Sequence, residues 1–191
     1  MALRKIATIG HPVLREAARD LTRDELSGSR VQQLVDDMID TMRDASGAGI
    51  AANQVYEAVR ICVIEVDKNP RYPYKPDWPL TVLVNPRLEP RTEETFMNFE
   101  GCLSVPNLRG LVPRFTVVRV RALDRRGQEL DFEVRGLTAG TFQHELDHLD
   151  GKLFVDRVTD TRTLCTWADY ERFHRDEFVA RAKALIARFG S

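Results

Sequence analysis

The most regular hydrophobic pattern in the chain predicts an amphipathic helix in its first quarter. Apolar side chains recur there three and four positions apart, which places them on one face of a helix. Ser27 or Ser29 offers an N-cap, and Gly47 provides a stop signal. The positions that predict this buried face are Val31, Leu34, Val35, Met38, Ile39 and Met42.

Two apolar runs, residues 60–66 and 80–85, predict buried strands. The intervening residues 67–79 contain four prolines. Proline cannot donate to a strand ladder, so we expect a loop, as a surface connection rather than part of a substrate entrance. Residues 115–122 and 129–134 alternate apolar and polar positions around an Asp-Arg-Arg-Gly turn, which predicts a hairpin.

Two further helices are expected in the second half of the chain. One carries residues 142–149, with Thr138 as its N-cap, and the other covers residues 167–189. Paired strands followed by segregated helices predict an α+β fold. We expect mixed, mainly antiparallel sheets around a central helix, with a helix at the C-terminal end.

The composition suits a single domain over residues 1–191, with a motif-bearing core of about 6–156 and a helical extension of about 160–191. A content of 43% hydrophobic residues can form a substantial core. The formal net charge of −1 gives no indication of DNA or membrane binding. There is no apolar run near 18 residues and no apolar signal core, which predicts a cytoplasmic protein.

The candidate chemistry lies in residues 143–151, which contain His-Glu-x-x-His. Positions four apart share one helix face, so His144 and His148 can reach one metal ion. Glu145 can act as general base toward a water at that ion. The pattern indicates amide hydrolysis, but two histidines and a water leave a tetrahedral site one protein ligand short.

Three positions could supply the missing ligand. A third histidine, six residues after the second, is excluded because that position is Phe154. A carboxylate about twenty residues downstream, Asp169 or Glu171, could be the third ligand, and such a site would be typical of a zinc endopeptidase. Cys102 lies upstream in Glu-Gly-Cys-Leu-Ser-Val-Pro, a strand end or turn, and a thiolate is a good ligand for zinc or ferrous iron.

Cys102 also has two other interpretations. A lone cysteine is often a small buried apolar residue, and a nucleophile with a histidine base would leave the paired histidines and Glu145 without a role. The three cysteines are widely spaced, which argues against a disulfide framework and favours a reducing compartment. Cys62 and Cys165 are expected to be packing residues.

Three separated segments together resemble the motifs of the peptide deformylase family. Gly-Ala-Gly-Ile-Ala-Ala-Asn-Gln at 47–54 resembles the first, Glu-Gly-Cys-Leu-Ser at 100–104 matches the second, and residues 143–148 match the third. The resemblance covers about residues 6–156. It departs from the family at Ala48, where a larger aliphatic residue is usual.

The resemblance implies a metal-dependent hydrolase that removes the N-formyl group from formylmethionine at the N-terminus of newly made proteins and releases formate. The expected partners are N-formylmethionyl nascent peptides. The expected cofactor is one divalent ion, Fe²⁺ in the cell with Zn²⁺ as the alternative. Its ligands would be Cys102, His144 and His148, with Glu145 as the general base.

The resemblance also implies the remaining site residues. The Gln54 amide and the Leu103 backbone N–H would donate to the oxyanion that forms during hydrolysis. Several positions would bind the peptide or an apolar first side chain, although each also has an ordinary structural explanation as a turn glycine, core leucine, helical threonine or solvated arginine. These positions are Gly49, Gly101, Arg109, Leu137 and Thr141.

The last fourteen residues contain three cations, Arg181, Lys183 and Arg188, and no acid. Cations are favoured at a helix C-terminus, which is a sufficient reason for them. Since family members act on nascent chains, the resemblance also raises a contact between this helix and the ribosome. A non-enzymatic, ribosome-associated binding protein on the same fold is a further alternative, although Glu145 and Gln54 speak against it.

Overall fold

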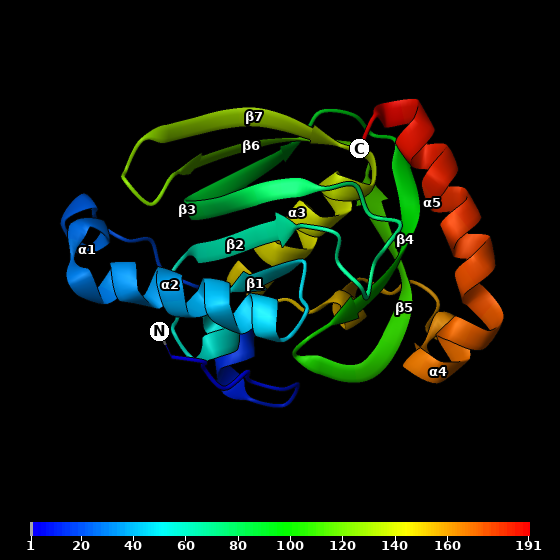
Figure 1. Ribbon diagram of the computed structural model, residues 1–191, viewed down its shortest axis with the longest axis horizontal. Helices are drawn as coiled ribbons and strands as arrows, with labels where there is room; N and C mark the ends of the chain where they lie inside the picture. Colours follow the sequence, from blue (N-terminus) through cyan, green and yellow to red (C-terminus); the bar gives the residue numbers. More distant parts are fainter. Residues whose placement is uncertain (1) are drawn as a thin grey trace.

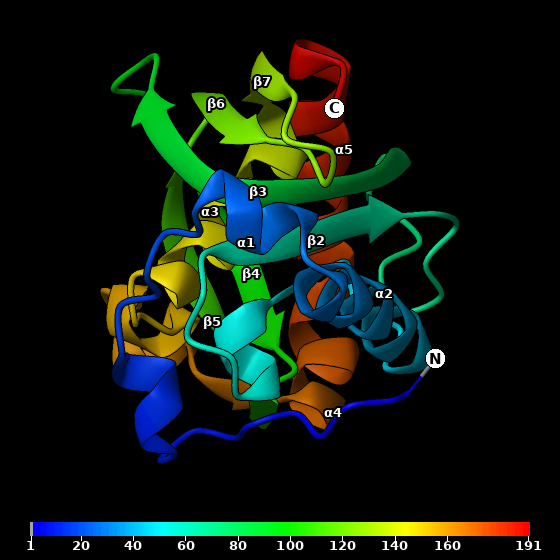
Figure 2. The same cartoon turned by 90° about the vertical axis from the view of Figure 1, so that its left-hand side faces the viewer.

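The computed structural model describes residues 2–191 and contains two sheets that both contact one helix, α3 (Figures 1 and 2). All strand pairs within the sheets are antiparallel, so the predicted α+β fold with a central helix is confirmed. The helices are α1 (Arg23–Ser27), α2 (Ser29–Asp44), α3 (Gly136–Leu149), α4 (Trp167–Asp169) and α5 (Arg175–Phe189).

The larger sheet has the strand order β1-β2-β3-β6-β7, and the smaller has the order β4-β5-β8. Short 3-10 turns cover Pro12–Arg15, Ala52–Val55, Phe154–Arg157 and Thr161–Thr163. The strands are β1 (Gly49–Ala51), β2 (Ile61–Val66), β3 (Trp78–Pro90), β4 (Thr95–Cys102), β5 (Val105–Phe115), β6 (Val117–Leu123), β7 (Glu129–Arg135) and β8 (Cys165–Thr166).

Helix α2 confirms the first amphipathic pattern, and its apolar face is buried against strands of the larger sheet. The predicted cap was wrong, because the N-cap is Gly28 and no side chain caps the helix. The hydroxyl of Ser27 instead donates to the carbonyl of Asp24, which belongs to α1. The helix ends at the C-cap Ala45, two residues before the expected stop at Gly47.

Strands β2 and β3 confirm the two buried strands, and β6 with β7 confirms the hairpin. The loop expected over residues 67–79 is two residues too long. Strand β3 begins at Trp78, which pairs with Val66. Pro79 is therefore inside a strand. It is exposed, and a proline is tolerated at a strand start, where its missing N–H costs no ladder bond.

The N-terminus of α3 was also predicted incorrectly, because Thr138 lies inside the helix and the N-cap is Arg135. The cap comes from the other end of the chain. The backbone N–H of Leu137 donates to the carbonyl of Ser191 at 3.0 Å, and the Ser191 hydroxyl donates to the Arg135 carbonyl at 2.7 Å. A side chain at Gly136, which has φ +54°, would overlap with the Ser191 carbonyl.

The expected C-terminal helix is present, but a π-helical turn at Tyr170–His174 separates α4 from α5. Its inner face packs on α3, since Tyr170 and Phe178 are buried in one cluster with Leu137 and Phe99. Figure 1 shows α5 beside β4, on the opposite side of the molecule from α1. Within residues 2–191, no helix has both the length and the apolar character needed to span a membrane.

We expect deletion of Gly190 and Ser191 to lower the melting temperature by several degrees. The deletion leaves the Leu137 N–H in the first turn of α3 without its acceptor, at a cost of about 1 kcal/mol or more. Each kcal/mol corresponds to roughly 2–4 °C at this chain length. Thermal unfolding measures this. Ser191→Ala keeps the carbonyl that accepts from Leu137, so its melting temperature should fall less than that of the deletion. An unaltered melting temperature in the deletion would contradict the cap.

Candidate metal centre

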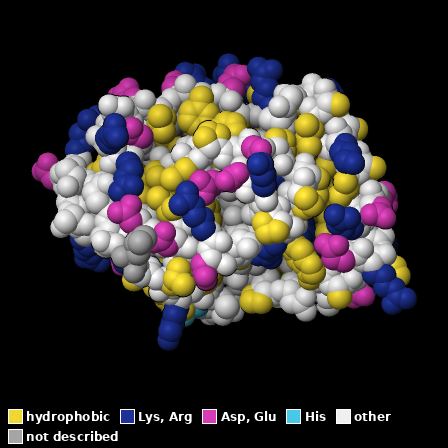
Figure 3. All heavy atoms as spheres, in the orientation of Figure 1, with side chains coloured by type: hydrophobic (Ala, Val, Ile, Leu, Met, Phe, Trp, Pro, Cys, Tyr) yellow, Lys and Arg dark blue, Asp and Glu magenta, His cyan; other side chains and the backbone are white. Residues whose placement is uncertain are grey.

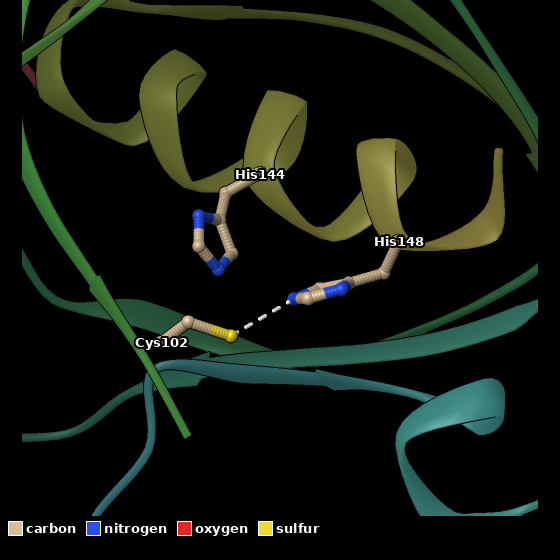
Figure 4. Close-up of side chains that lie close together, drawn as sticks. All are labelled: Cys102, His144 and His148. Atoms are coloured by element: carbon tan, nitrogen blue, oxygen red, sulfur yellow. Dashed lines mark hydrogen bonds between the residues drawn. The ribbon is translucent and has the colours of Figure 1, made fainter. Parts of the chain in front are cut away.

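The three predicted metal ligands lie together between β4 and α3. Cys102 is the last residue of β4, and its sulfur points toward the two imidazoles, which extend from successive turns of α3 (Figure 4). Cys102 Sγ lies 3.2 Å from His148 Nε2, and one potential ligand atom from each of Cys102, His144 and His148 lies within 4.8 Å of the others.

This donor set fits a divalent metal ion. Ligands at 2.0–2.3 Å from a tetrahedral ion are about 3.3–3.6 Å apart, close to the observed separation of Cys102 and His148. One thiolate and two imidazoles suit zinc or ferrous iron. His148 is fully buried, and burial holds its pKa well below the usual value, so its ring is neutral as ligation requires.

The carboxylate alternative for the third ligand is wrong. Asp169 belongs to the C-terminal extension and accepts a hydrogen bond from the hydroxyl of Thr166. Glu171 pairs with Arg175 at 3.2 Å on the surface. Phe154 occupies the position of a third histidine and stacks beside His144, with ring centroids 6.4 Å apart.

His144 is oriented by Glu100, a role that the sequence did not reveal. Glu100 Oε2 lies 2.8 Å from His144 Nδ1, which leaves Nε2 to face the ligand cluster. Both oxygens of Glu100 also accept from Arg114, at 2.7 and 2.9 Å, and Arg114 bridges to Asp147 on α3. Burial opposes ionisation of Glu100, but Arg114 outweighs it and lowers the pKa of the carboxyl.

Gln54 and Ser104 surround the sulfur of Cys102. The Gln54 carbonyl oxygen accepts from the Ala51 N–H at 2.8 Å, which orients the amide, and its Nε2 donates to the Ser104 hydroxyl at 3.0 Å. The same Nε2 lies 3.6 Å from the sulfur, and the Ser104 N–H donates to the sulfur at 3.3 Å. Donors of this kind stabilise a thiolate. Ser104 was present in the motif but had not been assigned a role.

Glu145 is placed by the absence of a side chain at Gly49. A Cβ at Gly49 would lie 2.5 Å from Glu145 Oε1, so strand β1 can approach the carboxyl only at a glycine. Glu145 is 4% exposed, and its Oε2 has no hydrogen-bond partner within residues 2–191. Burial raises the pKa of Glu145 to about 7, against the opposing charges of His144 and Lys75. A carboxyl in this state can both accept and return a proton near neutral pH.

A cavity opens beside these groups, and its walls include most of the residues expected to contact substrate. Leu137 is the exception, because it lies behind the wall in the apolar cluster with Phe99 and Tyr170. The predicted residues that line the cavity are Gly49, Gln54, Gly101, Cys102, Leu103, Arg109, Thr141, His144 and Glu145, and Ala48 lines it as well.

Arg109 is enclosed rather than solvated, with 1% of its surface exposed. Its guanidinium carbon lies 4.1 Å from the ring centroid of Tyr170 and 4.6 Å from that of Trp167, within cation–π range. Its Nη2 donates to the Phe99 carbonyl at 2.7 Å. The C-terminal extension therefore packs against Arg109, which itself lines the cavity.

The proline-rich loop also lines the cavity, so its interpretation as a surface connection was wrong. Arg71, Tyr72, Tyr74 and Lys75 all contribute to the wall. The loop is held by Asn69, whose side-chain amide donates to the carbonyls of Ser46 and Gly47. Composition had suggested exposure, but the aromatic residues pack inward.

A family model for polypeptide deformylases matches residues 3–163. The chain belongs to the peptide deformylase family. Peptide deformylase 2 of a Nostoc species is 39% identical over 166 residues, which cover 87% of this chain and 92% of the relative. The peptide deformylase of Heliobacterium modesticaldum is 46% identical over 158 residues, covering 83% and 95%.

Solved deformylase structures agree. A class I type b peptide deformylase from Acinetobacter baumannii has a TM-score of 0.80 and 38% identity, and it covers 83% of this chain and all of its own. A peptide deformylase from Legionella pneumophila has a TM-score of 0.72 and 34% identity, covering 98% of this chain and 99% of its own.

As a family member, the protein is a metal-dependent hydrolase that removes the N-formyl group from nascent peptides. The predicted resemblance is confirmed. The two alternative functions, a zinc endopeptidase and a non-enzymatic binding protein, are therefore rejected. Cys102, His144 and His148 form the group that can bind one metal ion.

We expect Cys102→Ser to lose metal on dialysis, because a hydroxyl replaces the only anionic ligand of the cluster. Metal content per chain, measured by elemental analysis, should fall severalfold. Cys165→Ser is the matched control, since that residue lies in β8 and packs with the extension. Equal metal content in the two variants would contradict ligation by Cys102.

Proposed function

We propose that the protein hydrolyses the formyl amide of N-formylmethionyl peptides in the cavity beside Cys102, His144 and His148, with Glu145 as the general base. The observation that supports this most directly is the buried Glu145 carboxyl, whose Oε2 has no hydrogen-bond partner within residues 2–191, next to three convergent ligand atoms. Such a pair of features is what amide hydrolysis by an activated water requires.

We propose Fe²⁺ as the metal in the cell and Zn²⁺ as the alternative. The intrinsic affinity of N and S sites favours zinc over iron, while cellular supply decides occupancy. When bound, the ion supplies Lewis-acid polarisation and lowers the pKa of a water toward about 7.

The remaining chemistry belongs to residues of the chain. Glu145 accepts a proton from the attacking water, whose oxygen bonds to the formyl carbon. Gln54 Nε2 carries two protons, of which one is donated to Ser104 and the other faces Cys102 Sγ at 3.6 Å. The second would turn from the sulfur to the oxyanion, to which the Leu103 N–H also donates. Glu145 returns the proton to the leaving nitrogen as the C–N bond breaks, which yields formate and a free amine.

The cavity walls support peptide binding at this position. One solved structure of the Acinetobacter baumannii relative is described as Met-Ala-Ser bound, with 38% identity and a TM-score of 0.79. We propose that the present cavity takes a peptide N-terminus in the same way, with Gly49, Gly101, Arg109 and Thr141 along it. Leu137 would act indirectly, by packing behind Phe99.

We also propose that the whole chain acts as one domain. Tyr170 and Phe178 of the extension share an apolar cluster with Phe99 of β4 and Leu137 of α3, and Ser191 caps α3. Removing the extension would therefore expose core side chains and disturb the helix that carries the metal ligands.

Formate release from formyl-Met-Ala-Ser tests the proposed function, with acetyl-Met-Ala-Ser as the blocked control. The wild type should release formate, chelation should abolish this, and Glu145→Ala should lose about 10²–10⁴-fold in turnover while keeping its metal. Full activity of Glu145→Ala would contradict the general-base role.

The same assay tests the placement of Glu145 by Gly49. Gly49→Ala should keep the metal but lose about 10-fold or more in kcat, because its Cβ displaces the carboxyl. Combined with Glu145→Ala, it should cause little additional loss, since no carboxyl remains to be displaced. Additive losses would show that Gly49 acts elsewhere.

We further propose that α5 contacts the ribosome through Arg181 and Lys183. Both are exposed, and Lys183 forms no ion pair within residues 2–191, whereas Arg188 is paired with Glu94. The surface view in Figure 3 shows cations and acids interspersed on the face it presents, so any such contact would be local. The ion pair between Arg181 and Glu177, at 3.8 Å, is solvent-exposed and weak.

Charge reversal tests the ribosome contact without damaging the fold, unlike truncation. Arg181→Glu with Lys183→Glu should weaken co-sedimentation with ribosomes severalfold at low salt. Lys5→Glu with Lys152→Glu changes the net charge equally at exposed positions elsewhere and should have little effect. Equal binding by the two double variants would reject a role for α5.

A further inference from the structure

One cation in the cavity has no assigned role in the reaction. Lys75 lies on the proline-rich loop and lines the cavity together with Glu145 and His144. The loop was expected to be a surface connection, and neither the metal group nor the oxyanion donors require a lysine there. Its position relative to the reacting atoms can be derived from its contacts.

Lys75 reaches the cavity face of α3. Its Nζ donates to the Thr141 hydroxyl at 2.9 Å and lies 4.9 Å from the ring centroid of Tyr72. Thr141 precedes His144 by three residues and Glu145 by four, so the three share one helix face, about one 5.4 Å turn apart. The hydroxyl that binds the ammonium is therefore about one helical turn from His144 and Glu145.

The charge of Lys75 is not neutralised by an ion pair within residues 2–191. Glu100, the acid that lines the cavity beside Glu145, is already bound to Arg114 and His144. Arg109 is also enclosed, with its guanidinium carbon 5.7 Å from the Tyr72 ring centroid. It is likewise without a carboxylate partner there, and its Nε and Nη1 have no hydrogen-bond partner. Lys75 and Arg109 therefore bring positive charge to this part of the cavity without a carboxylate bound to either of them within the described residues.

The ammonium retains unused hydrogen-bond capacity. It has three donors, and the hydroxyl of Thr141 takes one. Burial lowers the pKa of Lys75 to about 8, with Glu100 opposing that change, so the group is mostly protonated at pH 7. Lys75 is partly buried, and a partly buried cation with open donors is stabilised when an acceptor binds it.

The wall around Lys75 combines aromatic and polar groups. The Tyr72 ring contacts the ammonium, Thr141 and Asn98 add polar side chains, and Ala48 and Gly140 leave room for a ligand atom to approach. A slot built only for a thioether would gain from apolar lining, since the thioether sulfur is a weak acceptor. An oxygen at the end of the first side chain would find a strong donor here.

We propose that Lys75 is a specificity-determining residue that binds an acceptor oxygen on the first side chain, namely the sulfoxide oxygen of oxidised formylmethionine. Oxidation converts the thioether into a polar group that an apolar slot rejects. A side chain of methionine length ends about 5–6 Å from the formyl carbon. This length is similar to the one helical turn that separates Thr141, which binds Lys75, from Glu145. The proposal rests on the proposed deformylase function.

The test compares kcat/KM for formyl peptides X-Ala-Ser, in which X is methionine sulfoxide, norleucine, methionine or glutamate. The decisive variant is Lys75→Met, which keeps the length and removes the donor. The kcat/KM of the sulfoxide peptide divided by that of the norleucine peptide should fall about 10–100-fold. This is the usual effect of losing a hydrogen bond to a charged group. Lys75→Arg should restore part of the ratio.

Lys68→Met is the matched control, because Lys68 is exposed on the same loop and does not line the cavity. It should leave the ratio unchanged. The proposal is overturned if Lys75→Met also leaves the ratio unchanged, or if all peptides lose activity equally, which would show a structural role through Thr141. A loss confined to the glutamate peptide would overturn the sulfoxide assignment. Absence of turnover of formyl-Met-Ala-Ser by the wild type would instead reject the proposed function.

Discussion

The metal centre depends on the hydrogen bond between Glu100 and His144, which joins strand β4 to helix α3. Cys102 follows two residues later on the same strand, so one contact both orients an imidazole and brings the sulfur to the helix. Glu100 can remain ionised in the interior because Arg114 binds both of its oxygens and continues to Asp147 on α3. Loss of one partner from such a buried ion pair typically costs about 3–5 kcal/mol, so the fold and the site are stabilised by the same residues.

Local spacing explains which parts of the site could be predicted from the sequence. His144 and His148 face one ion because they are four residues apart on a helix, and this needs no tertiary information. Cys102 was found through its motif, while the role of Glu100 depends on how β4 is placed against α3. The cap of α3 was missed for the same reason: its acceptor, Ser191, is more than fifty positions from the start of the helix, and no local pattern marks it.

The proline-rich loop illustrates a different limit of sequence patterns. The prolines correctly excluded a regular strand ladder over most of residues 67–79. They do not indicate whether the loop faces solvent or packs against the rest of the protein. Tyr72 is buried, and Asn69 ties the loop to the segment before Gly49. The loop therefore brings Arg71 and Lys75 to the cavity, and the chemical character of that wall follows from tertiary packing rather than from composition.

The cap that Ser191 provides to α3 has a consequence for the order of folding. The Leu137 N–H at the start of the helix that carries both histidines meets its acceptor only after Ser191 has been synthesised and α5 has packed. Sheet strands β1 to β7 can pair earlier, as they emerge. Maturation of the catalytic helix should thus be among the latest events in biosynthesis, and additions fused directly behind Ser191 would have to leave its carbonyl in place.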